Sequence, residues 1–116
     1  MRAYSRKMKP VIWLGNSKID LKAFPSSAKD DMGHQLFRVQ CGLDPDDWKP
    51  MPTVGPGVRE IRSWDACGGF RIIHVAKFAG AVCVLHCFEK KTKKTSKTDL
   101  DLAAKRYRDL IQDLGR

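Results

Sequence analysis

Residues 57–97 read GVREIRSWDACGGFRIIHVAKFAGAVCVLHCFEKKTKKTSK, and the other predicted elements are arranged around this stretch. It contains three short runs rich in β-branched and aromatic residues, separated by turns that contain glycine. The runs cover residues 57–63, 70–78 and 81–89. The second and third runs are largely apolar on both faces, which is typical of strands in the interior of a sheet. The stretch therefore predicts a small antiparallel sheet.

The flanking segments predict one more strand and three helices. Residues 10–15 (PVIWLG) favour a first strand, and Asn16 or Ser17 can cap a short helix that stops near residue 24. A second helix is expected to begin at Pro25 and to end at Gly42. A last helix is expected to be capped by Ser96 or Thr98 and to end at Gly115. The prediction is an α+β fold, in which two N-terminal helices and a C-terminal helix pack on a twisted antiparallel sheet.

Length and charge narrow the class of protein. The chain has 116 residues, so we expect a single domain over 1–116, with residues 1–9 as a flexible N-terminus. The net charge is +9, of which residues 57–116 carry +6. This excess favours an anionic partner such as nucleic acid, an acidic protein or a membrane surface. No stretch approaches the roughly 20 apolar residues of a membrane-spanning helix.

The cysteines and the known motifs argue against a bound cofactor. The sequence has four cysteines but no CxxC pair, so we expect no zinc site. Cys83 and Cys87 lie in an apolar run and are interpreted as small buried residues of a reduced, cytoplasmic protein. No phosphate-binding glycine loop, catalytic triad or paired catalytic carboxylates is present. We therefore expect neither a metal nor a nucleotide cofactor.

A lysine cluster follows the last predicted strand. It comprises five lysines against one acid, Glu89, and its members are Lys90, Lys91, Lys93, Lys94 and Lys97. One interpretation is a solvated loop before a helix. The other is a phosphate-binding surface, because the first lysines directly follow a buried strand and are held by rigid backbone.

Three arginines lie in the first two strands of the stretch. By strand alternation, Arg62 shares a face with Glu60, whereas Arg59 lies on the other face. Arg62 and Arg71 each need an anionic partner or a wet cleft. Pairing with a carboxylate such as Glu60 is one possibility, and a bidentate phosphate clamp beside the lysines is the other.

Histidines and aromatic residues supply weaker candidates. His34 is expected on a helix surface, and His74 and His86 are expected to be hydrogen-bonded core histidines. His86 lies four residues before Lys90, so it remains a candidate acid or base. Phe88 and Trp48 can stack on bases, although either one alone is more often a core residue.

Together these segments resemble a known family. The stretches DWKPMPTVGPGVREIRS, FRIIHVAKF and VCVLHCFEKKTKKTSKTDLDLAAKRYRDL are similar to the phage-derived branch of the RelE/ParE toxin superfamily, close to HigB-like toxins. The most specific pieces are EIR at 60–62, FR at 70–71 and LHCFEKKTKKT at 85–95, and the resemblance covers residues 10–112. It implies the toxin of a type II toxin–antitoxin module, which cleaves mRNA, usually in the ribosomal A site, inhibits translation and arrests growth.

The resemblance also implies partners and roles. The partner is an antitoxin with a helix-turn-helix DNA-binding domain, and operator DNA is reached only through it. Arg62 and Arg71 would stabilise the phosphate, and Lys90 or Lys91 would act in proton transfer or charge stabilisation. The RNA would be held by Phe88 and by basic side chains, namely Lys93, Lys94, Lys97 and Arg59.

One departure from the family pattern bears on the mechanism. His74 stands where relatives commonly have a tyrosine, and residues 57–97 contain no tyrosine. A mechanism that uses a tyrosine acid is therefore not expected.

Two other functions fit the same residues. ParE-like relatives share the fold and act on a protein target, DNA gyrase, without a nuclease site. A plain nucleic-acid-binding domain would also satisfy the positive charge. The cationic cluster at the end of the sheet favours the nuclease over the gyrase-directed toxin.

Overall fold

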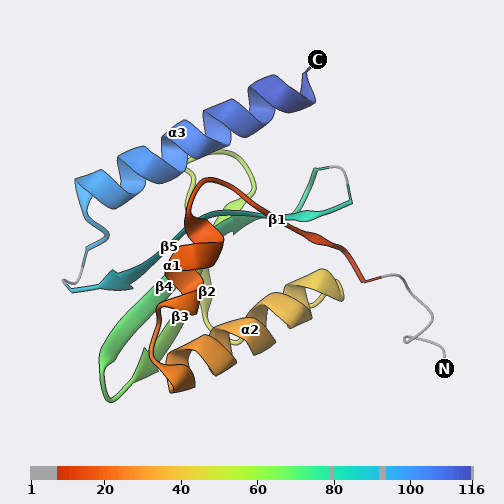
Figure 1. The fold of residues 1–116 in the computed structure, drawn as a ribbon. Coiled ribbons are helices and arrows are strands. Elements are labelled where there is room, and N and C mark those ends of the chain that lie inside the picture. Colours follow the sequence, from red (N-terminus) through yellow and green to blue (C-terminus); the bar gives the residue numbers. More distant parts are fainter. Residues whose placement is uncertain (1–7, 79, 92–93, 116) are drawn as a thin grey trace, which may run out of the picture.

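The computed structural model of the chain describes residues 8–78, 80–91 and 94–115. Within these residues the fold is α+β, as predicted, with helices on both sides of one sheet (Figure 1). The elements in chain order are β1 (Val11–Trp13), α1 (Ser17–Lys22), α2 (Ser26–Gln40), β2 (Trp48–Pro50), β3 (Val58–Asp65), β4 (Gly68–Val75), β5 (Val82–Lys90) and α3 (Lys97–Leu114). The expected flexible N-terminus, residues 1–9, lies outside the described residues except for its last two.

The described strands form one five-stranded sheet in the order β1-β5-β4-β3-β2. β4 and β5 are interior strands, as their apolar faces predicted. The β2–β3, β3–β4 and β4–β5 pairs are antiparallel, whereas β1 runs parallel to β5. β2 lies in residues 43–56, where the sequence predicted neither a helix nor a strand. Its sequence, WKP, ends in a proline, a residue that usually argues against a strand because it lacks a backbone N–H. An edge strand such as β2 tolerates proline.

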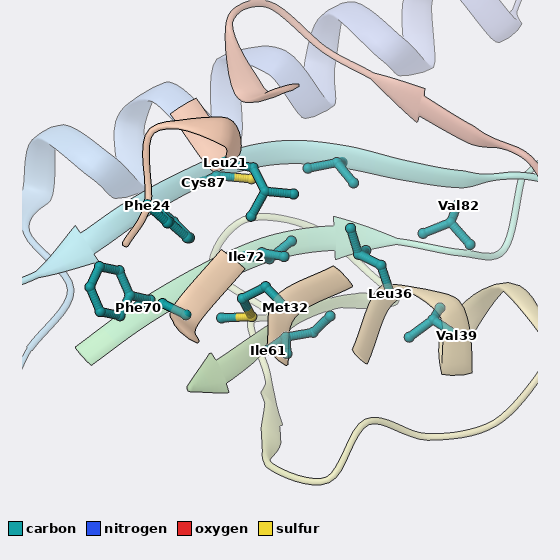
Figure 2. Close-up of a cluster of buried hydrophobic side chains, with 12 residues drawn as sticks. Leu21, Phe24, Met32, Leu36, Val39, Ile61, Phe70, Ile72, Val82 and Cys87 are labelled. Atoms are coloured by element: carbon teal, nitrogen blue, oxygen red, sulfur yellow. The ribbon is translucent and has the colours of Figure 1, made fainter. Parts of the chain in front are cut away.

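One face of the sheet packs against α1 and α2. The second helix begins at Ser26, one residue after the predicted Pro25, and ends at Gln40, two residues before the predicted Gly42; its buried stripe of Ala28, Met32, Leu36 and Val39 confirms the helical spacing. This stripe contacts Ile61, Phe70 and Ile72 of β3 and β4, together with Leu21 and Phe24 from the α1 region (Figure 2). Burial of these side chains fixes the register of the strands, because a shift by one residue would turn them outward.

The opposite face packs against α3. Ser96 caps this helix by accepting a hydrogen bond from the Asp99 amide at 3.1 Å, in agreement with one of the two predicted caps. Ala103 and Leu110 are buried on the sheet side of the helix and belong to a second core cluster that includes Leu85 of β5. α3 therefore covers the face of the sheet opposite to α1 and α2.

A bulge in β5 changes which side chains face α3. Ile73 pairs with His86, but the next residue, His74, pairs with Val84, so Leu85 is the extra residue. Leu85 packs in the α3-side core, and His86 contacts Asp99 of α3. The bulge thus allows two consecutive residues to face the same helix.

Candidate functional site

Two arginines and an aromatic residue form a row across the sheet. Arg62 of β3 lies directly opposite Arg71 of β4, and Arg71 lies directly opposite Phe88 of β5. In the neighbouring row, Lys90 lies opposite Gly69. Side chains two residues apart along a strand share a face, so these groups converge at one end of the α3-facing side of the sheet. The register therefore brings together four of the predicted site residues.

Arg71 is held in a buried ion pair. Its Nε lies 3.5 Å from Oε1 of Glu60, and both side chains are fully buried. The guanidinium also donates a hydrogen bond to the Phe70 carbonyl at 2.9 Å, and the Thr95 hydroxyl donates to Oε2 of Glu60 at 3.0 Å. Burial lowers the pKa of Arg71, and the Glu60 carboxylate opposes that shift. The carboxylate pairing that the sequence allowed is thus present for Arg71.

Lys90 lies at the end of β5 beside this ion pair. It is 8% exposed. Burial lowers the pKa of its ammonium group, and the positive charge of Arg71 lowers it further, whereas Glu60 opposes the shift. Lys49 and Arg62 add smaller contributions in the same direction as Arg71. A lysine with a lowered pKa is better suited to proton transfer near neutral pH than an exposed lysine is.

A pocket opens where β5 gives way to α3. Its volume is about 250 Å³, and the residues that line it are mostly lysines and acids: Glu89, Lys90, Lys91, Lys94, Ser96 and Asp99. Lys97 lies outside this lining, is exposed, and pairs with Asp101 at 2.8 Å. Lys93 lies outside the described residues. The predicted lysine cluster is therefore partly a lined pocket and partly a solvated helix start.

His86 is buried against the same site. Its Nε2 lies 2.7 Å from Oδ1 of Asp99, and its ring stacks on Phe88 with centroids 4.8 Å apart. His86 is 6% exposed, so it is a core histidine, as expected; its Nε2 has a carboxylate partner, whereas its Nδ1 has no hydrogen-bond partner among the described residues. Asp99 lines the pocket, contacts His86 and lies in the first turn of α3, where a carboxylate is also favourable for the helix dipole.

Arg59 lies apart from these residues. It pairs across the strands with His74, contacts Asp44 at 3.0 Å, and places its guanidinium 4.0 Å from the centroid of the Trp48 ring. Its position on the other face agrees with the strand alternation. Arg59 therefore does not share a surface with Arg62 and Lys90, and an RNA contact from Arg59 stays a prediction for a separate surface.

The interpretation of His74 as a hydrogen-bonded core histidine is wrong in one respect. The ring is 1% exposed, but neither of its nitrogens has a hydrogen-bond partner among the described residues. Burial lowers the pKa of His74 to about 4, and the charge of Arg59 adds to the shift. The hydrogen-bond partners of a buried histidine come from residues that are distant in the sequence. The pattern of its own strand therefore does not predict whether such partners are present. His34 is exposed, as expected.

Trp64 is a neighbour of the site that the sequence analysis did not identify. Its ring centroid lies 4.7 Å from the guanidinium carbon of Arg71. Trp64 falls beyond the predicted end of its strand at residue 63, whereas β3 continues to Asp65. Sequence patterns define the end of a strand poorly. Because the predicted strand stopped one residue before Trp64, this aromatic residue was not placed beside the arginines.

Other kinds of site find no support in the described residues. No group of three or more His, Cys, Asp or Glu side chains in residues 8–78, 80–91 and 94–115 is arranged to hold a metal ion. Among the same residues, none of the helices combines the length and the apolar character needed to cross a bilayer. Cys83 and Cys87 are buried free thiols, as predicted.

The sequence matches the model of one protein family. No curated protein matches the chain. Residues 19–108 match the family model described as phage derived protein Gp49-like (DUF891). The match covers most of the chain and contains the arginine row, Lys90, the lining of the pocket and Trp64. The chain therefore belongs to the Gp49-like family of phage-derived proteins, a family of toxins from toxin–antitoxin modules related to RelE and HigB.

Proposed function

We propose that this protein is the toxin of a type II toxin–antitoxin module and that it cleaves mRNA on the ribosome. The observation that carries the proposal is the convergence of Arg62, Arg71, Phe88 and Lys90 at one end of the sheet, beside the lysine-lined pocket. Membership of a family of RelE- and HigB-related toxins supports the same conclusion. Cleavage of mRNA would inhibit translation and arrest growth in the cytoplasm.

The chemistry of RNA cleavage matches these side chains. The 2′-oxygen attacks the adjacent phosphorus, the bond to the 5′-oxygen breaks, and the products carry a 2′,3′-cyclic phosphate and a 5′-hydroxyl. One group must remove the 2′-hydroxyl proton, another must protonate the leaving oxygen, and cations must stabilise the phosphorane. Lysine and arginine can supply all three functions, so no metal is required for this proposal.

The burial of each cation suggests its role. Arg71 is fully buried in its pair with Glu60, so we assign it a positioning role: its charge lowers the pKa of Lys90. Arg62 is only partly buried and lies opposite Arg71, which suits a direct contact with the phosphate. Lys90 is the favoured proton-transfer group, because its pKa is lowered, and Lys91 and Lys94 line the pocket that would receive the RNA backbone.

The proposed partner in the resting state is an antitoxin that carries a helix-turn-helix DNA-binding domain. The net charge of +9 favours an acidic segment of such a partner. Binding to operator DNA would then occur through the antitoxin and not through this chain.

The test is induced expression with mapping of mRNA 5′ ends. Wild type is compared with Arg62→Ala and with Lys90→Ala/Lys91→Ala, and Lys105→Ala serves as the control. Lys105 is an exposed lysine that pairs with Asp109 in α3. We expect growth arrest with new in-frame cuts from wild type and Lys105→Ala, and neither from the site variants.

Other outcomes would redirect the assignment. Arrest without new cuts would move the target to a protein such as DNA gyrase. Salt-dependent RNA binding without cleavage or arrest would leave a nucleic-acid-binding domain. Arrest with cuts that persist in folded Arg62→Ala and Lys90→Ala/Lys91→Ala variants would place the active site elsewhere on the chain.

A further inference from the structure

An exposed tryptophan adjoins the cationic site. Trp64 lies in β3 directly opposite Gly69 of β4, and Gly69 lies directly opposite Lys90 of β5. Trp64 is 63% exposed, although tryptophan is a side chain that folded proteins usually bury in large part. The register therefore puts a large, solvent-accessible aromatic ring at the end of the sheet that carries the arginine row.

The glycine opposite Trp64 gives the ring its position. A Cβ atom at residue 69 would lie 2.7 Å from a carbon of the indole, which is closer than van der Waals contact permits. The ring thus occupies the space that a side chain at this position would fill. Because Gly69 has no side chain, the indole can lie across the strand and reach Arg71.

The cation that the ring contacts is buried and ion-paired. The guanidinium carbon of Arg71 lies 4.7 Å from the centroid of the indole, within the range of a cation–π contact. Arg71 itself is held by Glu60 and by the Phe70 carbonyl, and it is fully buried. The indole therefore packs on a buried, ion-paired side chain, while much of its own surface faces solvent.

We propose that Trp64 is a stacking platform for an unpaired base of the RNA that this protein binds. This inference rests on the proposed function and extends it by a binding subsite. Aromatic rings stack on bases with little regard to their identity, and lysines beside them neutralise the phosphates. Lys90, Lys91 and Lys94 provide those charges in the adjoining pocket. An acidic peptide would use the lysines but would gain little from an exposed indole.

Fluorescence of Trp64 tests the platform directly. The chain has three tryptophans, so a Trp13→Phe/Trp48→Phe variant retains Trp64 as the reporter. The probe is a short single-stranded 2′-O-methyl oligoadenylate, which lacks the nucleophilic hydroxyl and stays intact. A strand of the same length without bases is the matched control. We expect quenching by the base-bearing strand and little by the abasic strand.

Binding measurements with three variants complete the test. We expect Trp64→Ala to weaken binding of the oligoadenylate roughly ten-fold, to the level of the abasic strand, and Trp64→Phe to retain part of the affinity. Gly69→Ala keeps the indole but displaces it, so it should weaken binding in the same way. Phe37→Ala is the control, because Phe37 is also an exposed aromatic residue but lies on α2, at the opposite face of the sheet.

The possible failures separate this inference from the proposed function. Equal affinity of wild type and Trp64→Ala for the oligoadenylate, or the absence of binding by wild type, would overturn the platform. Loss of binding to a purified antitoxin in Trp64→Ala, with RNA affinity unchanged, would assign the indole to a protein interface instead. Neither result would change the mRNA cuts or their dependence on Arg62 and Lys90. The proposed nuclease activity is therefore tested separately, by the mapping of mRNA 5′ ends.

Discussion

Arg71 and Glu60 form an ion pair between two fully buried side chains, with Nε and Oε1 3.5 Å apart. Removing both charges from water costs several kcal/mol for each ion, and their mutual attraction offsets this cost only in part. The pair is nevertheless retained at the end of the sheet, where its cation supports Trp64 and lowers the pKa of Lys90. We interpret the pair as the element that fixes charge and geometry in the candidate site.

The free energy of unfolding should depend on whether both charges of the Arg71–Glu60 pair are present or both are removed together. Arg71→Ala leaves the Glu60 carboxylate buried without its cation, so we expect the free energy of unfolding to fall by about 3–5 kcal/mol. Replacing both residues with apolar ones, as in Arg71→Met/Glu60→Leu, should restore most of the loss. Urea denaturation measures both effects. Lys97→Ala is the control: it removes one partner of an exposed pair and should cost less than about 1 kcal/mol. A double variant no more stable than Arg71→Ala would contradict this interpretation.

His74 should make the fold sensitive to mild acid. Its pKa is about 4 in the folded protein, below the ordinary value of 6.5, so the unfolded chain binds a proton more readily between these values. The free energy of unfolding should therefore fall as the pH is lowered from 6.5 to 4. The contribution is on the order of 3 kcal/mol at about 1.36 kcal/mol per pKa unit.

Denaturation curves across this pH range would isolate the histidine. His74→Gln should flatten the pH dependence, even if the variant is less stable overall. His34→Gln, which replaces an exposed histidine, should leave the dependence as in wild type. An unchanged slope in His74→Gln would mean that other groups dominate the acid response.

The four cysteines should divide into two reactivity classes. Cys41 and Cys67 are exposed, whereas Cys83 and Cys87 are buried. Burial raises the pKa of the Cys87 thiol to about 12 and also raises that of Cys83, and the thiolate is the reactive form. Mass spectrometry after brief treatment with iodoacetamide should find label on the exposed pair in the folded protein and on all four in urea. Rapid labelling of Cys87 under native conditions would show that β5 opens locally.

The lysines of the pocket should govern the salt dependence of RNA binding. For single-stranded RNA, each neutralised phosphate contributes roughly 0.7 to the slope of log affinity against log salt concentration. We expect Lys91→Gln and Lys94→Gln each to reduce the magnitude of the slope by about this amount. Lys105→Gln removes an exposed lysine of α3 that does not line the pocket, and it should leave the slope unchanged. If Lys91→Gln and Lys94→Gln both kept the slope of the wild type, as Lys105→Gln should, the RNA would bind outside the pocket.

The fold was largely predictable because its main signals are local. α3 has a regular apolar spacing, a serine cap and a terminal glycine, and the interior strands are apolar on both faces. The parallel direction of β1 was not predictable, because it is set by pairing with residues about seventy positions away. β2 was missed because its proline weakens the strand pattern, although an edge strand tolerates it.

The site was predictable by residue type but not by arrangement. Charge alone identified Arg62, Arg71 and the lysines. The cross-strand register decides that Arg62 lies beside Arg71 and that Trp64 lies over Gly69, and a sequence does not state this register. Strand alternation did separate Arg59 from Arg62, and the structure confirms the separation. The contact of His86 with Asp99 depends on a bulge, for which the run VCVLHCFEK carries no local signal.

Cleavage of a defined mRNA in a purified translation complex would show whether this protein is a ribosome-dependent nuclease. The message is compared with a copy in which the nucleotide at the cleavage site carries a 2′-deoxy substitution. We predict a single cut that leaves a 5′-hydroxyl and a 2′,3′-cyclic phosphate, and we predict that both the 2′-deoxy message and the Lys90→Ala/Lys91→Ala variant abolish it. Cleavage that persists at the 2′-deoxy nucleotide would exclude attack by the 2′-oxygen, and an intact message in the presence of folded wild-type protein would exclude ribosome-dependent cleavage.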